Sequence, residues 1–171
     1  MKVILVGYMG SGKTTVGKAL AEKLGINFLD LDTVIEEGEQ CTITELFETV
    51  GQIRFRKKEH HYLNELLDDR RPMVLATGGG APCYSGNMKT ILEASPNVFY
   101  LRLSIPELVK RLVPNKAERP LISHLDAAEM PEFLGKHLFE RNNFYQEAHH
   151  AIGCDGKTVE EVTSEIQKLL V

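Results

Sequence analysis

Residues 7–14 form the densest group of residues in the chain that can do chemistry. They read Gly-Tyr-Met-Gly-Ser-Gly-Lys-Thr, which matches the pattern G-x-x-x-x-G-K-[ST], and they directly follow the apolar run Val3–Val6. A loop that wraps a polyphosphate needs backbone N–H groups close to oxygen without an intervening Cβ, and glycine provides this. The spacing therefore predicts a nucleoside triphosphate site.

Two residues at the end of this loop have expected roles at the phosphates. Lys13 is placed to reach the β- and γ-phosphates, and Thr14 is placed to put its hydroxyl on Mg²⁺. The helix expected over 14–24 points its positive dipole end at the anion. A glycine-rich turn without nucleotide is the alternative, and the strand–loop–helix context disfavours it. The predicted nucleotide ligands are Gly10, Ser11, Gly12, Lys13, Thr14 and Thr15.

Two carboxylates stand at the end of the second apolar run, Phe28–Leu31. Asp30 and Asp32 are two residues apart, which predicts that they share one face of an extended strand. Near a phosphate-binding loop, Asp30 is a candidate to hold Mg²⁺ through its water shell. Asp32 is a candidate catalytic residue that orients or deprotonates a substrate alcohol. The alternative for Asp32 is an N-cap of a helix over 33–37.

Arginines supply candidate sites for a small acid. Arg56 lies in a basic cluster on a helix expected over 42–68, beside the apolar Phe55, and a bidentate guanidinium suits a carboxylate. The alternative is a surface helix on which Arg56 pairs with Glu59. Arg141, on a helical segment with aromatic neighbours, is a second candidate.

A glycine run follows the strand expected over Met73–Ala76. Because such a run costs backbone entropy, it indicates a backbone that approaches a ligand, with a plain turn as the alternative. Thr77 stands where a P-loop protein usually has an acidic residue, which leaves Asp30 as the better magnesium candidate. The glycines are Gly78, Gly79 and Gly80.

The segment of about 113–130 is polar and punctuated by prolines, and it predicts a mobile lid over the reacting phosphates. Arg119 lies on this lid and is expected to stabilise charge in the transition state. Arg111, on the preceding helix, is placed to stack on the adenine, although an ordinary surface position fits it equally well.

Length and composition favour one ordinary domain over residues 1–171. The chain has 43% hydrophobic and 26% charged residues, and it needs no oligomerisation for stability, so a monomer is expected. A net charge of −4 disfavours nucleic acid as a partner. No window is apolar enough for a membrane span, and the opening apolar run is too short for a secretory signal, so we expect a cytoplasmic protein.

Five short apolar runs alternate with helical patterns along the chain. This alternation predicts an α/β protein with a mainly five-stranded parallel sheet between helical layers, a three-layer α/β/α P-loop fold. Binding groups then gather where strands lead into helices, with a substrate-binding helical region at about 32–62. The expected strands are Val3–Val6, Phe28–Leu31, Met73–Ala76, Val98–Leu103 and Ala151–Ile152.

Together these motifs resemble the shikimate kinase family of P-loop proteins over nearly the whole chain. The resemblance implies transfer of the γ-phosphoryl group of ATP to the 3-hydroxyl of shikimate, with Mg²⁺, on the way to chorismate and the aromatic amino acids. The motifs that carry it are Gly7–Thr14, Leu29–Asp32, Phe55-Arg56 with Glu59, Gly78–Gly80, Arg119–Leu121, and Arg141 four residues before Tyr145.

The resemblance also implies roles for single residues. The chain departs from the family in its last loop, where Cys154–Lys157 stands instead of the usual Arg or Pro near the adenine. The implied shikimate ligands are Asp32, Arg56, the backbone of Gly78–Gly80, and Arg141, with the two arginines flanking the carboxylate. The residues implied for Mg·ATP are Lys13, Thr14, Asp30 and Arg119.

Two other classes of protein stay open on the sequence. A kinase for gluconate or a nucleoside monophosphate would share the phosphate-binding loop but lack the acid pocket. A GTP-dependent switch would bind partners instead of converting metabolites. Residues 115–118 partly match the guanine-specificity pattern N-K-x-D, but they end in Glu, and no D-x-x-G follows the third strand.

Overall fold

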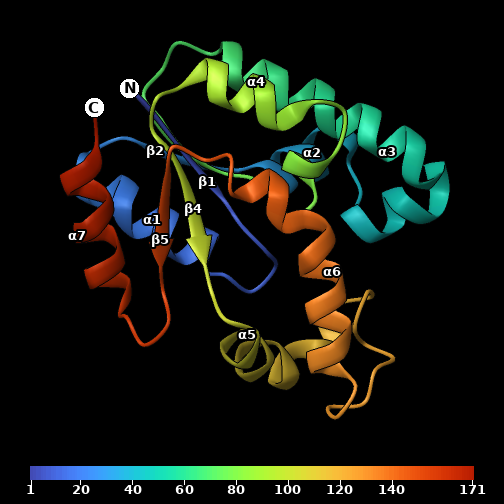
Figure 1. The fold of residues 1–171 in the computed structure, drawn as a ribbon. Coiled ribbons are helices and arrows are strands. Elements are labelled where there is room, and N and C mark those ends of the chain that lie inside the picture. Colours follow the sequence, from blue (N-terminus) through green and yellow to red (C-terminus); the bar gives the residue numbers. More distant parts are fainter.

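The computed structural model describes all 171 residues, and a parallel five-stranded sheet lies at its centre (Figure 1). The strand order is β2-β3-β1-β4-β5, so the strand that leads into the phosphate-binding loop is central. In register, Val3 is opposite Val74 and Ile4 is opposite Val98. The strands are β1 Lys2–Val6, β2 Asn27–Asp30, β3 Met73–Ala76, β4 Val98–Arg102 and β5 His150–Gly153.

Helices cover both faces of this sheet. Helices α1 and α7 contact each other on one face, and α3 and α4 lie over the other (Figure 1). The predicted three-layer α/β/α fold is confirmed. The helices are α1 Lys13–Leu24, α2 Leu31–Glu39, α3 Ile43–Asp68, α4 Asn87–Ala94, α5 Ile105–Leu112, α6 Met130–Tyr145 and α7 Val159–Leu169, with short 3₁₀ turns η1 Ala81–Cys83 and η2 Val113–Glu118.

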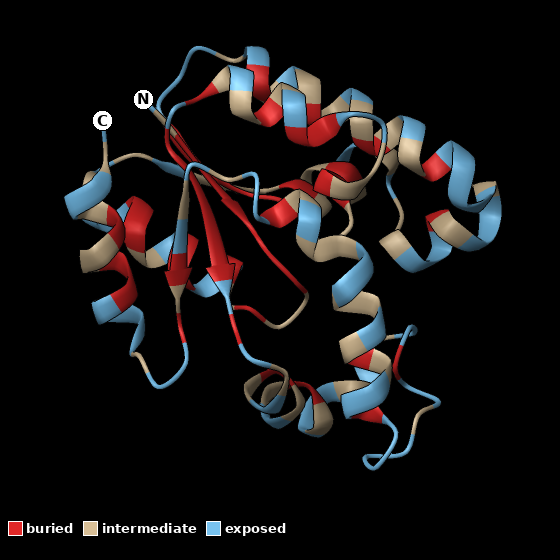
Figure 2. Ribbon diagram, in the orientation of Figure 1, coloured by how far each residue is buried: buried red, intermediate tan, exposed pale blue.

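The core lies between the sheet and these helices. Figure 2 shows the central strands as buried, in agreement with the unbroken apolar runs expected of a sheet that is covered on both faces. The helices add Leu20, Leu63, Ile91 and Ile166, none of which is exposed to solvent. This packing fixes the carboxyl ends of β1, β2 and β3, from which the site is built. None of the helices has the length and apolar character needed to cross a membrane.

The end of β2 differs from the sequence prediction. The strand stops at Asp30, whose carboxylate accepts a hydrogen bond from the backbone N–H of Asp32 at 3.1 Å and so caps α2. The prediction that both carboxylates share a strand face was therefore wrong, and so was the alternative that Asp32 is the cap. Aspartate is a favoured N-cap residue at either position. Because β2 ends at Asp30 and α2 begins directly after it, Asp30 is the cap.

The long helix also differs in one detail. Gly51, with φ of 76°, interrupts the helical conformation of α3, which the sequence predicted as continuous.

The predicted lid begins with η2 and continues as turns until α6 starts at Met130. Ile122 anchors the turns because it is fully buried in the core, and the Lys116 ammonium donates to the carbonyl of Leu125.

Candidate active site

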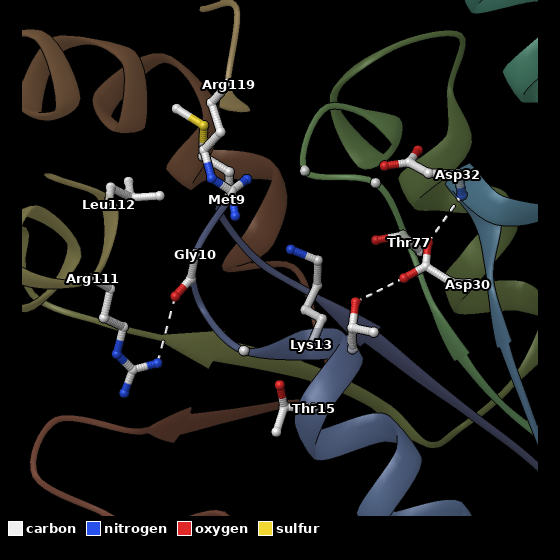
Figure 3. A pocket seen from close by; sticks show the side chains of 14 residues that line it. Met9, Gly10, Lys13, Thr15, Asp30, Asp32, Thr77, Arg111, Leu112 and Arg119 are labelled. Carbon is white, nitrogen blue, oxygen red and sulfur yellow. Dashed lines mark hydrogen bonds between the residues drawn. The ribbon is translucent and has the colours of Figure 1, made fainter. Parts of the chain in front are cut away.

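A cavity of about 410 Å³ opens at the carboxyl ends of the central strands (Figure 3). It brings together residues from the phosphate-binding loop, the end of β2, the glycine run after β3 and the predicted lid. Four predicted site residues do not line it: Ser11, Arg56, Gly80 and Arg141. Those that do are Gly10, Gly12, Lys13, Thr14, Thr15, Asp30, Asp32, Gly78, Gly79, Arg111 and Arg119.

The phosphate-binding loop holds Lys13 at the floor of this cavity. Gly12 has a φ of 93°, in the left-handed region where glycine is favoured, and it turns the chain directly into α1. The Lys13 ammonium donates to the carbonyls of Gly7 at 2.7 Å and Tyr8 at 3.0 Å. Burial lowers the pKa of Lys13 to about 8, against the opposing effects of Asp32 and Asp30. The lysine thus lies beside two carboxylates at the predicted phosphate position.

Thr14 and Asp30 lie next to each other at the wall of the cavity. The Thr14 hydroxyl donates to one carboxylate oxygen of Asp30 at 2.8 Å (Figure 3). A hydroxyl and a carboxylate beside a phosphate site are the hard oxygen donors that Mg²⁺ prefers. The pair therefore fits the magnesium role predicted for it.

Asp32 lies partly buried in the wall of the cavity, beside Gly78. Burial raises its pKa to about 6, and the nearby carboxylates of Asp30 and Glu59 add to this, while Lys13 opposes it. A Cβ built on Gly78 would lie 2.8 Å from Asp32 Oδ1, so only glycine lets the wall approach so closely. A carboxylate that titrates near neutral pH suits general-base chemistry.

Arg56 lies behind the glycine run. Its guanidinium donates to Glu59 at 2.7 Å, and Glu59 is only 1% exposed. The predicted i,i+3 pair therefore forms, but inside the protein and not on its surface. A Cβ on Gly80 would lie 2.7 Å from a terminal nitrogen of Arg56, and the guanidinium lies 4.0 Å from the centre of the Tyr84 ring. Arg56 Nε is buried without a hydrogen-bond partner, which leaves a donor for a ligand.

Arg141 lies on α6 near the same group. Burial raises the pKa of Glu59, and the positive charges of Arg56 and, less strongly, Arg141 oppose this rise. One turn later on α6, the Tyr145 hydroxyl donates to the carbonyl of Gly79. Glu59 and Tyr145 entered the sequence analysis only as parts of the family motifs and, for Glu59, as a surface partner of Arg56, with no role of their own, because side-chain burial so far from the phosphate-binding loop has no local signal.

The two other predicted site arginines, Arg111 and Arg119, line the main cavity. A terminal nitrogen of Arg111 lies 3.5 Å from the carbonyl of Gly10, and its Nε donates to Glu107 at 3.1 Å. Arg111 also lines a smaller cavity of about 190 Å³ with Ser11, Cys154 and Lys157. Arg119, at the end of η2, reaches the main cavity and is seen above the phosphate-binding loop in Figure 3.

Comparison with known proteins identifies the family. A family model described as shikimate kinase matches residues 9–171. The chain belongs to the shikimate kinase family. It is 42% identical over 169 residues to a shikimate kinase of Flavobacterium johnsoniae, covering 99% of this chain and 98% of that protein.

Solved structures of shikimate kinases have the same fold. A shikimate kinase from Bacteroides thetaiotaomicron aligns with a TM-score of 0.91 at 35% identity, covering 99% of this chain and 97% of that one. One from Acinetobacter baumannii, in complex with shikimate, aligns with a TM-score of 0.88 at 36% identity, covering 98% and 91%. The resemblance and the fold class predicted from the sequence are thus both confirmed.

Proposed function

We propose that the protein transfers the γ-phosphoryl group of ATP to the 3-hydroxyl of shikimate, giving shikimate 3-phosphate and ADP for the synthesis of chorismate and the aromatic amino acids. Membership of the shikimate kinase family supports the substrate class. The observation that carries the proposal is the position of Asp32. Asp32 lines the main cavity together with Lys13 on the nucleotide side, and its carboxylate lies against Gly78 of the glycine run, whose Gly80 lies against Arg56 on the acid side.

In this proposal the acid is bound through its carboxylate. Arg56 lies against Gly80, and Arg141 lies one turn before Tyr145, whose hydroxyl donates to the carbonyl of Gly79, so both offer positive charge near the glycine run. A guanidinium binds a carboxylate through two parallel hydrogen bonds. The backbone of Gly78, Gly79 and Gly80 forms the wall against which the ring lies. Asp32 then accepts a hydrogen bond from the 3-hydroxyl and directs its oxygen towards the phosphate position.

The reaction is an in-line phosphoryl transfer, in which the hydroxyl oxygen forms a bond to phosphorus as the bond to the ADP oxygen breaks. Lys13 and Arg119 balance the charge of the transferred group. Asp32 aligns the alcohol and takes its proton, and positioning supplies most of the rate. Mg²⁺, held by Thr14 and Asp30, would supply further charge neutralisation at the phosphates.

We further propose that residues 1–171 act as one monomeric kinase domain in the cytoplasm, where ATP is available, with no nucleic acid or membrane as a partner. Residues 113–130 are proposed as a lid that closes over the nucleotide, and about 32–62 as the substrate-binding region. The proposal for the lid is supported by Arg119, which lines the cavity from this segment.

A panel of acceptors tests the reaction. The purified protein is incubated with Mg·ATP and with shikimate, gluconate or a nucleoside monophosphate, and ADP release is followed by a coupled assay. We expect rapid release only with shikimate, and a new phosphorus–proton coupling at C3 in the NMR spectrum of the product. Faster release with gluconate or a nucleotide would instead favour the other kinase class.

A further inference from the structure

The phosphate-binding loop contacts the helix that carries Arg141. The hydroxyl oxygen of Tyr8 lies 2.6 Å from Nδ1 of His137 on α6, and the two rings meet edge to face with centroids 5.4 Å apart. Tyr8 is only 2% exposed, so loss of this partner would leave a buried hydroxyl without a hydrogen bond. The contact joins residues that are 129 positions apart in the chain.

His137 and Arg141 are one helical turn apart, and residues at this spacing lie on the same face of a helix. Burial and then the Arg141 charge lower the pKa of His137 to about 4. The imidazole of His137 is therefore neutral at pH 7, and its Nδ1 forms a hydrogen bond with the Tyr8 hydroxyl. Of His137 and Arg141, only Arg141 is charged.

The backbone of Tyr8 is connected to the nucleotide side. Its carbonyl accepts a hydrogen bond from the Lys13 ammonium at 3.0 Å. A triphosphate that draws this ammonium towards its β- and γ-phosphates releases the carbonyl. The peptide of Tyr8 thus responds to the nucleotide, while its side chain holds α6.

We propose that Tyr8 and His137 are positioning residues that couple the two substrate sites, so that a bound nucleotide tightens the binding of the acid at Arg141. The inference rests on the proposed function in one respect, because it takes shikimate as the acid bound by Arg141. Coupling of this kind is reciprocal, so the acid tightens nucleotide binding by the same factor.

Calorimetry measures the coupling directly. The Kd for shikimate is determined with and without saturating Mg·ADP. The coupling factor is the Kd without Mg·ADP divided by the Kd with it. In the wild-type protein we expect a ratio above one. Tyr8→Phe and His137→Leu should each lower it about two- to tenfold, the range expected for one lost hydrogen bond. The double variant should lose no more than either single variant, because both remove the same bond.

Tyr100→Phe is the matched control. Tyr100 is also 2% exposed, and its hydroxyl donates to Asn142 Oδ1 on the same helix at 3.0 Å, but it lies on β4, outside the phosphate-binding loop. We expect this variant to lose stability much as Tyr8→Phe does and to keep the wild-type coupling factor. An equal loss of coupling in both variants would reduce the role of Tyr8 to general support of α6 and overturn the proposal.

Other results would overturn it as well. A wild-type coupling factor of one, or an unchanged factor in a folded Tyr8→Phe or His137→Leu variant, would refute the coupling while leaving the kinase activity in place. A wild-type protein that binds nucleotide but no shikimate would refute the proposed function and this inference with it. Variants on both sides of the bond keep the test decisive if one of them does not fold.

Discussion

Asp32→Asn should make the unliganded protein more stable while it removes the group that we propose aligns the alcohol. Burial, followed by the charges of Asp30 and Glu59, raises the pKa of this carboxyl from 3.8 to about 6 in the folded protein. The folded state therefore holds the proton more tightly than the unfolded chain, and the free energy of unfolding falls as the pH rises from about 4 to about 6.

The size of the effect follows from this difference. At about 1.4 kcal/mol for each pKa unit, an ionised Asp32 costs about 3 kcal/mol of folding free energy above pH 6. Solvent reaches part of this side chain, and screening lowers the figure to about 2–3 kcal/mol. Asparagine has nearly the same shape and carries no charge, so the substitution removes this cost.

Urea unfolding at two pH values measures the folding free energy that the ionised Asp32 costs. Without nucleotide or acid, Asp32→Asn should raise the free energy of unfolding by about 2–3 kcal/mol at pH 7.5 and by about 1 kcal/mol at pH 4.5, where the cost is only beginning to appear. The control is Asp68→Asn at an exposed position at the end of α3, which should stay within about 0.5 kcal/mol at both pH values.

Two results would refute this reasoning. If Asp32→Asn were no more stable than the wild-type protein at pH 7.5, burial of the ionised carboxylate would not destabilise the folded state. If its gain were the same at both pH values, the cause would be packing and not charge. In either case the account of Asp32 as a base with a raised pKa would fail.

The other predictions concern the reaction. Lys13→Met should abolish turnover, and measurable steady-state activity would argue against its role at the phosphates. Arg56→Ala and Arg141→Ala should each raise the KM for shikimate at least tenfold and leave the KM for ATP nearly unchanged, whereas an unchanged shikimate KM in both would remove them from the acid pocket. In the wild-type enzyme, kcat/KM for shikimate should rise as the pH passes about 6, where Asp32 loses its proton; a flat profile from pH 5 to 7 would contradict this. Hydrogen exchange over 113–130 should slow when both substrates are bound, and no protection would count against a closing lid.

The nucleotide side could be predicted from the sequence because its chemistry is local. The spacing of residues 7–14 specifies a loop between a strand and a helix, and the structure places this loop after the central strand β1. The glycines after β3 were also predictable, since a close approach of the backbone needs glycine wherever the partner lies. That Gly78 approaches Asp32 and Gly80 approaches Arg56 became visible only in the fold.

The acid side shows what the sequence could not predict. An i,i+3 pair of Arg56 and Glu59 has the same spacing on a surface helix as in a buried one, and packing against Tyr84 and the glycine run decides between them. The same holds for Tyr8 and His137, whose contact depends on how α6 lies against the phosphate-binding loop. Such contacts come from tertiary structure and have no periodicity that a sequence pattern reveals.

The most direct test of the account compares shikimate with its methyl ester, which keeps the three hydroxyls and lacks the negative charge. If Arg56 and Arg141 bind the carboxylate beside the ATP site, kcat/KM should fall at least about a hundredfold with the ester, because two half-buried guanidinium groups lose their partner. Equal phosphorylation of acid and ester would contradict a cationic pocket for the acid.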